Sequence, residues 1–272
     1  MKIIDSHIHF WDTGNGLNDW VKETNLPKKV IPNDIVDTDS FVHIEAHTQD
    51  QNSLCEYNWL KSNFPNKNIK VVAFVDFTQD LDIFKKGVDI ISRKEDIVGV
   101  RHIMAKTDKS KYSPFDDRVP YDILEKLRVL KENNLIFEAQ LYPEQFLPLL
   151  NLIDKSGVIM AIEHFGLPIF GENDNLIEWQ ILIKKIAQND KWYLKLSGFE
   201  FNNNYKYLNK ALKFVFENIE SSRLCYGSNF PVSNTDNNTK WAIILKNQIK
   251  DDNTLKNIFF NTSNQLYGFI KV

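Results

Sequence analysis

The sequence contains few cysteines, no excess of positive charge and no long apolar run. Its two cysteines, Cys55 and Cys225, lie far apart and lack the spacing of a metal site, so a disulfide scaffold is not expected. The formal net charge of −3 offers no basic surface for nucleic acid. The chain has neither a signal-peptide core nor a stretch of about 20 apolar residues, so we expect no membrane partner. We therefore expect a cytoplasmic protein that acts on a small molecule; the oligomeric state is not readable from the sequence.

Eight short apolar segments are predicted to be buried strands, and segments of helical periodicity alternate with them. The strands are expected at 2–9, 41–46, 70–76, 98–104, 135–141, 158–164, 192–198 and 223–228, and the helices include 121–134, 176–190, 205–220 and 254–269. This alternation predicts a single-domain (β/α)₈ TIM barrel over residues 1–272. The alternative is an open doubly wound sheet, but no glycine-rich nucleotide-binding turn follows the first strand.

The histidines gather near the ends of the predicted strands, and none of the six falls in a predicted helix. His7 and His9 end the first strand, where side chains two residues apart point to the same face and could hold one metal ion, one water or one carbonyl oxygen. The other four are His43 and His47 in or after the second strand, His102 in the fourth and His164 at the end of the sixth. Because barrel active sites form at the C-terminal ends of strands, this pattern favours a catalytic mouth. For the two histidines near the second strand, a structural role is the stronger alternative.

Two long connections, 10–40 and 105–120, follow predicted strands, and we expect binding loops or lids there, with solvated surface loops as the alternative. Aromatic side chains that could stack on a ring-shaped ligand are Trp11, Trp20, Tyr112 and Phe230. Glu163 directly precedes His164, so the alternation of side chains along a strand predicts that Glu163 points away from the barrel interior.

Five motifs follow one another along the chain, each at the end of a predicted strand: SHIHFW, GVRH, EHFGLP, LKLSG and YGSNFPV. Together they resemble the lactonase-like branch of the amidohydrolase superfamily, the amidohydrolase 2 group, over nearly the whole chain. The resemblance implies a (β/α)₈ barrel and a hydrolase, since members of this branch open sugar lactones and a pyrone dicarboxylate. Several of these members work without a tightly required metal.

The resemblance also implies roles for individual residues. His7 and His9 match the strand-1 histidine pair of the family, and His164 matches its strand-6 histidine. These three, together with Asn229, are the candidate catalytic residues. If a divalent metal such as zinc is bound, the three histidines are its candidate ligands. Arg101 and His102 match the strand-4 pair that contacts substrate oxygens, and a guanidinium suits a carboxylate or a ring oxygen.

Two further candidate substrate-binding residues are Glu45 and Trp11. Glu45 falls where the family often has a polar residue pointing into the mouth, although a solvated carboxylate at a strand end is an equal alternative. The motif GSNFP departs from the family, because Asn229 stands where an aspartate usually takes a proton from water or binds metal. A neutral amide cannot take that proton and is a weaker zinc ligand. We therefore expect Asn229 to act by hydrogen bonding, and zinc binding to be weak or absent.

Three functions fit these residues. The first is a lactonase that opens a small sugar-acid or carboxylated lactone ring. The second is a decarboxylase or hydratase of the same superfamily, and the third is a ligand-binding barrel that lost its catalytic base at Asn229. In the first case a histidine, or Glu45 with a pKa raised by burial, could serve as the base.

Overall fold

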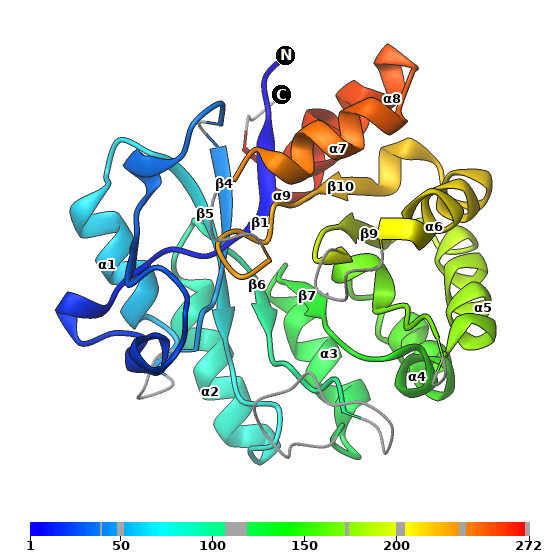
Figure 1. Cartoon of the computed structure of the whole chain (residues 1–272). Helices are drawn as coiled ribbons and strands as arrows, with labels where there is room; N and C mark the ends of the chain where they lie inside the picture. The colour runs from blue at the N-terminus through cyan, green and yellow to red at the C-terminus, as the bar shows by residue number, and fades with distance from the viewer. Residues whose placement is uncertain are drawn as a thin grey trace.

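Eight parallel strands form the centre of the molecule, and helices surround them (Figure 1). The computed structural model describes residues 1–38, 40–47, 52–106, 119–171, 174–199, 205–233 and 238–269. In the order in which they pair, the strands are β1 (Ile4–Ile8), β4 (Ser40–Ile44), β5 (Asn68–Phe74), β6 (Ile97–Arg101), β7 (Ile136–Ala139), β8 (Met160–Ile162), β9 (Trp192–Leu196) and β10 (Leu224–Tyr226). The predicted (β/α)₈ barrel is confirmed.

The outer layer consists of amphipathic helices whose apolar stripes pack on the strands. In α2, for example, Phe84, Val88 and Ile91 lie on one stripe and are buried. The helices are α1 (Cys55–Asn63), α2 (Leu81–Ser92), α3 (Ile123–Glu132), α4 (Pro143–Ser156), α5 (Leu176–Ala187), α6 (Tyr205–Asn218), α7 (Lys240–Gln248), α8 (Asp252–Lys256) and α9 (Thr262–Tyr267). The predicted helix at 254–269 is interrupted by a π-helical turn, Asn257–Asn261, which buries Ile258 and Phe259. Within the described residues, no helix is both long and apolar enough to span a membrane.

The barrel closes between β1 and the segment that follows β10. The backbone N–H of Asn229 donates to the carbonyl oxygen of His7 at 2.7 Å, and the N–H of His9 donates to the carbonyl oxygen of Phe230 at 2.9 Å. The first and last parts of the chain are thus joined by hydrogen bonds at the position of the predicted site.

The connection from residue 10 to residue 40 folds over the end of β4. It contains a two-stranded antiparallel ribbon, β2 (Trp11–Asp12) and β3 (Lys29–Val30), and several short 3₁₀ turns. The Trp20 indole N–H donates to the carbonyl oxygen of Ala46 at 2.8 Å, and the Trp11 and Trp20 rings meet edge to face with centroids 5.8 Å apart. This connection therefore lies at the predicted mouth, whereas most of the second one, including Tyr112, lies outside the described residues.

A buried ion pair lies inside the barrel. Lys195 Nζ is 2.7 Å from Glu138 Oε2, and neither side chain is exposed. The ammonium also donates to the carbonyl oxygen of Ser6 at 2.8 Å, and the Tyr267 hydroxyl donates to Glu138 at 2.6 Å. Strands β1, β7 and β9 and helix α9 are thereby connected through one charged cluster.

The variant Lys195→Met is expected to lower the free energy of unfolding by about 3–5 kcal/mol, because it leaves the Glu138 carboxylate buried without its cation. Urea unfolding measures this loss. Lys195→Met combined with Glu138→Gln should recover part of the stability, since the unpaired charge is then gone. Lys213→Met, which breaks an exposed pair with Glu217, is the control and should have little effect. A Lys195→Met variant as stable as the wild type would contradict the prediction.

Candidate active site

A cavity of about 280 Å³ lies at the C-terminal ends of the barrel strands. Its walls contain six residues that the sequence singled out, His9, Trp11, Trp20, Arg101, His164 and Asn229, together with Ala46, His47, Ile103, Gln140 and Val232. Most of the lining is apolar or aromatic, with a few polar groups from different strands, as is usual for small-molecule sites. The volume suits a ligand with a single ring.

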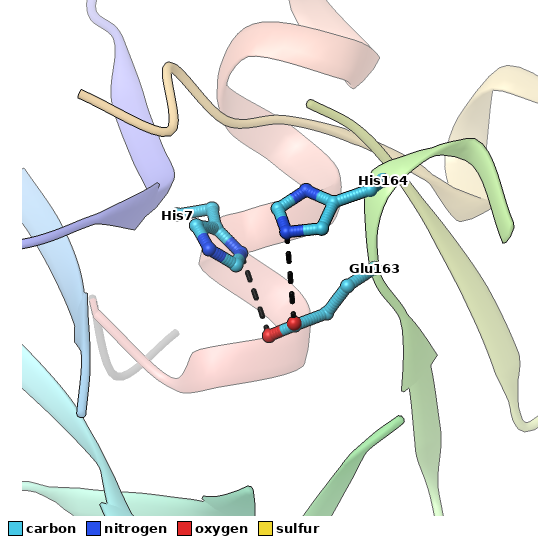
Figure 2. A group of neighbouring side chains, drawn as sticks. All are labelled: His7, Glu163 and His164. Atoms are coloured by element: carbon cyan, nitrogen blue, oxygen red, sulfur yellow. Dashed lines mark ion pairs between the residues drawn. The ribbon is translucent and has the colours of Figure 1, made fainter. Parts of the chain in front are cut away.

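A buried cluster of two imidazoles and a carboxylate lies beside this cavity (Figure 2). His7 Nδ1 is 3.5 Å from Glu163 Oε1, and His164 Nε2 is 3.9 Å from Glu163 Oε2. Both ring nitrogens of His7 and the Oε1 atom of Glu163 are buried, and within the described part of the chain they have no hydrogen-bond partner. One ligand atom from each of the three residues can be chosen so that all lie within 4.8 Å of one another. Two imidazoles and a carboxylate at this spacing, with ligand atoms of His7 and Glu163 that lack a hydrogen-bond partner among the described residues, fit a divalent cation.

Glu163 points into the barrel, so the prediction that it points away was wrong. The error lies in treating 158–164 as one strand. β8 ends at Ile162, and His164 has a left-handed backbone with φ of 52°. Ala161 packs with Val42, Ile44 and Val72 of other barrel strands, and Glu163, two residues further along, faces the same side. The turn at His164 then brings the imidazole toward the Glu163 carboxylate (Figure 2). Side chains do alternate along this strand, but the inward face is the one that contains Ala161. The prediction used His164, which lies beyond the end of the strand, as its reference.

The three site histidines are held in the neutral form. Burial is the main cause that lowers the pKa of His7, His9 and His164 well below the usual range, and nearby positive charge such as that of Arg101 adds to the effect. His9 Nδ1 is 2.9 Å from the carbonyl oxygen of Ile44, which only accepts, so Nδ1 carries the proton and Nε2 keeps its lone pair. Neutral imidazoles of this kind can bind a metal or accept a proton.

Arg101 is enclosed by two carboxylates. Its Nε donates to Glu45 Oε1 at 2.7 Å, and its Nη1 donates to Glu163 Oε2 at 3.2 Å. Nη1 also lies 3.4 Å from Gln140 Oε1. The predicted site residues Arg101 and Glu45 therefore lie together. Arg101 lines the cavity, and Glu45 lies behind it as its hydrogen-bond partner.

Asn229 belongs to the segment that closes the barrel, and it also lines the cavity. Its φ of 51° is in the left-handed region, which asparagine tolerates better than most residues. The side-chain amide donates to the Ser233 hydroxyl at 2.6 Å, which leaves the amide oxygen as a hydrogen-bond acceptor. The geometry is compatible with a residue that orients a water or a substrate hydroxyl.

The structure places His102 outside the lining of this cavity, and it therefore does not support the prediction that His102 contacts substrate. The ring packs against Phe74 and Phe77, and its Nδ1 accepts a hydrogen bond from the backbone N–H of Phe77 at 3.0 Å. The reason is strand alternation: Arg101 points to the mouth, so the side chain of its neighbour points to the other side, against residues at the end of β5. His43 is likewise structural, since its Nε2 lies 2.8 Å from the buried Glu56 carboxylate.

Sequence reasoning missed Gln140 and gave His47 a structural role, yet both line the cavity. Gln140 directly follows β7. The search for polar residues at strand ends considered mainly histidine and arginine, and it would have found Gln140 if it had included glutamine. His47 has a left-handed backbone with φ of 57°, which no motif indicates.

The position of His164 depends on the absence of a side chain at Gly198. A Cβ there would lie 2.4 Å from His164 Nδ1, and φ at Gly198 is +64°. We therefore expect Gly198→Ala to displace the imidazole and to lower activity and metal content at least about tenfold. Gly268→Ala is the matched control, because φ is +65° there but nothing lies within 4 Å of the added methyl. Equal effects of the two variants on metal content would contradict this account.

A parallel barrel with a histidine–carboxylate cluster at the C-terminal ends of its strands defines a TIM-barrel enzyme site. A model of the amidohydrolase family matches residues 4–269, and the chain belongs to this family. No curated protein matches the chain.

Solved structures share the fold at low sequence identity. An amidohydrolase from Burkholderia multivorans with bound zinc is 15% identical, with a TM-score of 0.79 and coverage of 98% of this chain and 99% of that one. A probable 2-pyrone-4,6-dicarboxylic acid hydrolase from Acinetobacter baumannii with bound citric acid is 18% identical, with a TM-score of 0.71 and coverage of 98% and 100%. A 2,6-dihydroxybenzoate decarboxylase from Rhizobium is 12% identical, with a TM-score of 0.61 and coverage of 98% and 99%.

Proposed function

We propose that this protein hydrolyses the ester bond of a small lactone. The observation that carries the proposal is the buried cluster of His7, Glu163 and His164. It lies beside a cavity that is large enough for a single ring and is lined by Trp11 and Trp20. Aromatic faces suit the flat side of a ring, and the cluster supplies polar groups where the ester carbonyl would lie. The similarity to a probable pyrone dicarboxylic acid hydrolase supports the same reaction class.

We further propose that His7, Glu163 and His164 hold a divalent metal such as zinc. The sequence-based expectation of weak zinc binding assumed that the carboxylate ligand had to come from position 229. Glu163 supplies a carboxylate elsewhere, and its unpartnered Oε1 lies near the unpartnered nitrogens of His7. A cation bound there would polarise a carbonyl oxygen and lower the pKa of a water.

The protein's own side chains account for the proton movements. His9 Nε2 carries a lone pair at the cavity wall and can take a proton from the attacking water. The water oxygen bonds to the carbonyl carbon, the ring C–O bond breaks, and the proton passes to the departing alkoxide oxygen. The Asn229 amide oxygen accepts a hydrogen bond from that water and orients it without removing a proton.

A panel of neutral and carboxylated five- and six-membered lactones, followed by acid release at constant pH, tests the proposal. We expect turnover that exceeds spontaneous hydrolysis for at least one ring. A second candidate is decarboxylation, which the structural similarity to a dihydroxybenzoate decarboxylase favours. Release of carbon dioxide from hydroxybenzoates, without turnover of any lactone, would replace the first proposal by the second.

A further inference from the structure

Gln140 has a buried hydrogen-bond donor with no partner. It directly follows β7, is 1% exposed and lines the cavity. Its Nε2 atom is buried and has no hydrogen-bond partner among the residues that the structure describes. A buried amide N–H₂ group without an acceptor costs free energy. We therefore expect a bound ligand to supply the acceptor atom.

The orientation of this amide is fixed by its neighbour. Gln140 Oε1 lies 3.4 Å from Arg101 Nη1, and a guanidinium can only donate hydrogen bonds. The oxygen must therefore face Arg101, and the nitrogen lies on the opposite side of the amide. Of the two polar atoms of the Gln140 amide, the uncharged N–H₂ group is therefore the one left to donate to a ligand.

The positive charge of Arg101 is already matched within the protein. Glu45 Oε1 is 2.7 Å from its Nε, and Glu163 Oε2 is 3.2 Å from its Nη1. All three side chains are nearly or fully buried, with exposed fractions of 6% or less. A substrate carboxylate at this position would have to compete with two protein carboxylates for one guanidinium, at a cost in electrostatic free energy.

We propose that Gln140 determines specificity by donating a hydrogen bond to a neutral acceptor oxygen of the lactone, and that the site prefers uncharged lactones to carboxylated ones. This inference rests on the proposed lactone hydrolysis and gives its substrate class. Arg101 then acts as a positioning residue, because it orients the Gln140 amide and holds Glu45 and Glu163. The neutral oxygen is a ring hydroxyl or the ester carbonyl.

The test compares wild type with Gln140→Met, which keeps the side-chain volume and removes the donor. Gluconolactone and the corresponding glucarolactone are the neutral and carboxylated substrates. We expect the wild type to have a kcat/KM at least about tenfold higher for the neutral ring. Gln140→Met should raise KM for that ring about 3- to 10-fold, with a smaller change in kcat. Gln188→Met, at the exposed end of α5, is the control and should match the wild type.

A binding titration separates failure of the inference from failure of the proposed function. Gluconolactam is a neutral analogue that resists hydrolysis, and it should bind the wild type more tightly than it binds Gln140→Met. If no lactone is hydrolysed but this difference in affinity is found, lactone hydrolysis is wrong and the role of Gln140 is supported. Preference of the wild type for glucarolactone would overturn the inference. Equal affinity of gluconolactam for the two proteins, or no binding to either, would also overturn it.

Discussion

Replacing Glu163 by glutamine is expected to abolish stoichiometric metal binding and to lower hydrolytic activity at least about 10³-fold. Glutamine keeps the size of the side chain but removes the negative charge that faces His7 and His164. Metal analysis of freshly purified protein and steady-state rates on the best lactone measure the two effects. The fold should remain intact, because Arg101 keeps its pairing with Glu45.

Glu56→Gln provides a matched control for Glu163→Gln. Glu56 is also a buried carboxylate paired with a histidine, but its partner is His43, and neither residue lines the cavity. This variant should lose stability and keep its metal. A Glu163→Gln protein that retains one ion per chain and full activity would show that Glu163 is not a ligand and that the cluster has another role.

Replacing Asn229 by aspartate is expected to raise lactone hydrolysis about tenfold or more. General-base catalysis is typically worth about 10²–10⁴-fold, and the gain can fall below this range, to about tenfold, because His9 already offers a base. The site can accept the change, since the Ser233 hydroxyl can donate to a carboxylate in place of accepting from the amide. A neutral lactone would not be repelled by the added charge.

The measurement is a comparison of wild type, Asn229→Asp and Asn229→Ala on the same neutral lactone. Alanine removes the hydrogen bond to water and should lower the rate. If Asn229→Asp is as slow as the wild type or slower, the pocket is built around a neutral amide, and an added anion is left without a partner among the buried groups.

The fold could be predicted because eight apolar segments of strand length recur between helical patterns, and a barrel is the architecture that this repetition favours. Placement of His7, His9, Arg101 and His164 at one mouth followed from counting strand ends. That Glu163 and His164 both point inward could not be predicted, because a backbone turn at His164, which no residue type indicates, brings the imidazole to the side that Glu163 faces. The same is true of the orientation of Gln140, which is fixed by contact with a residue about 40 positions away in sequence.

The hydrogen bonds that close the barrel have a consequence for how the enzyme is made. His7 and His9 are synthesised first, but the backbone groups that hold them in place belong to Asn229 and Phe230, near the other end of the chain. A nascent chain that lacks this closing segment leaves the backbone of both histidines unpaired at these positions. The active site is therefore complete only after the segment that follows β10 has docked on β1. During refolding, enzymatic activity is expected to return when the barrel closes, later than the secondary structure forms.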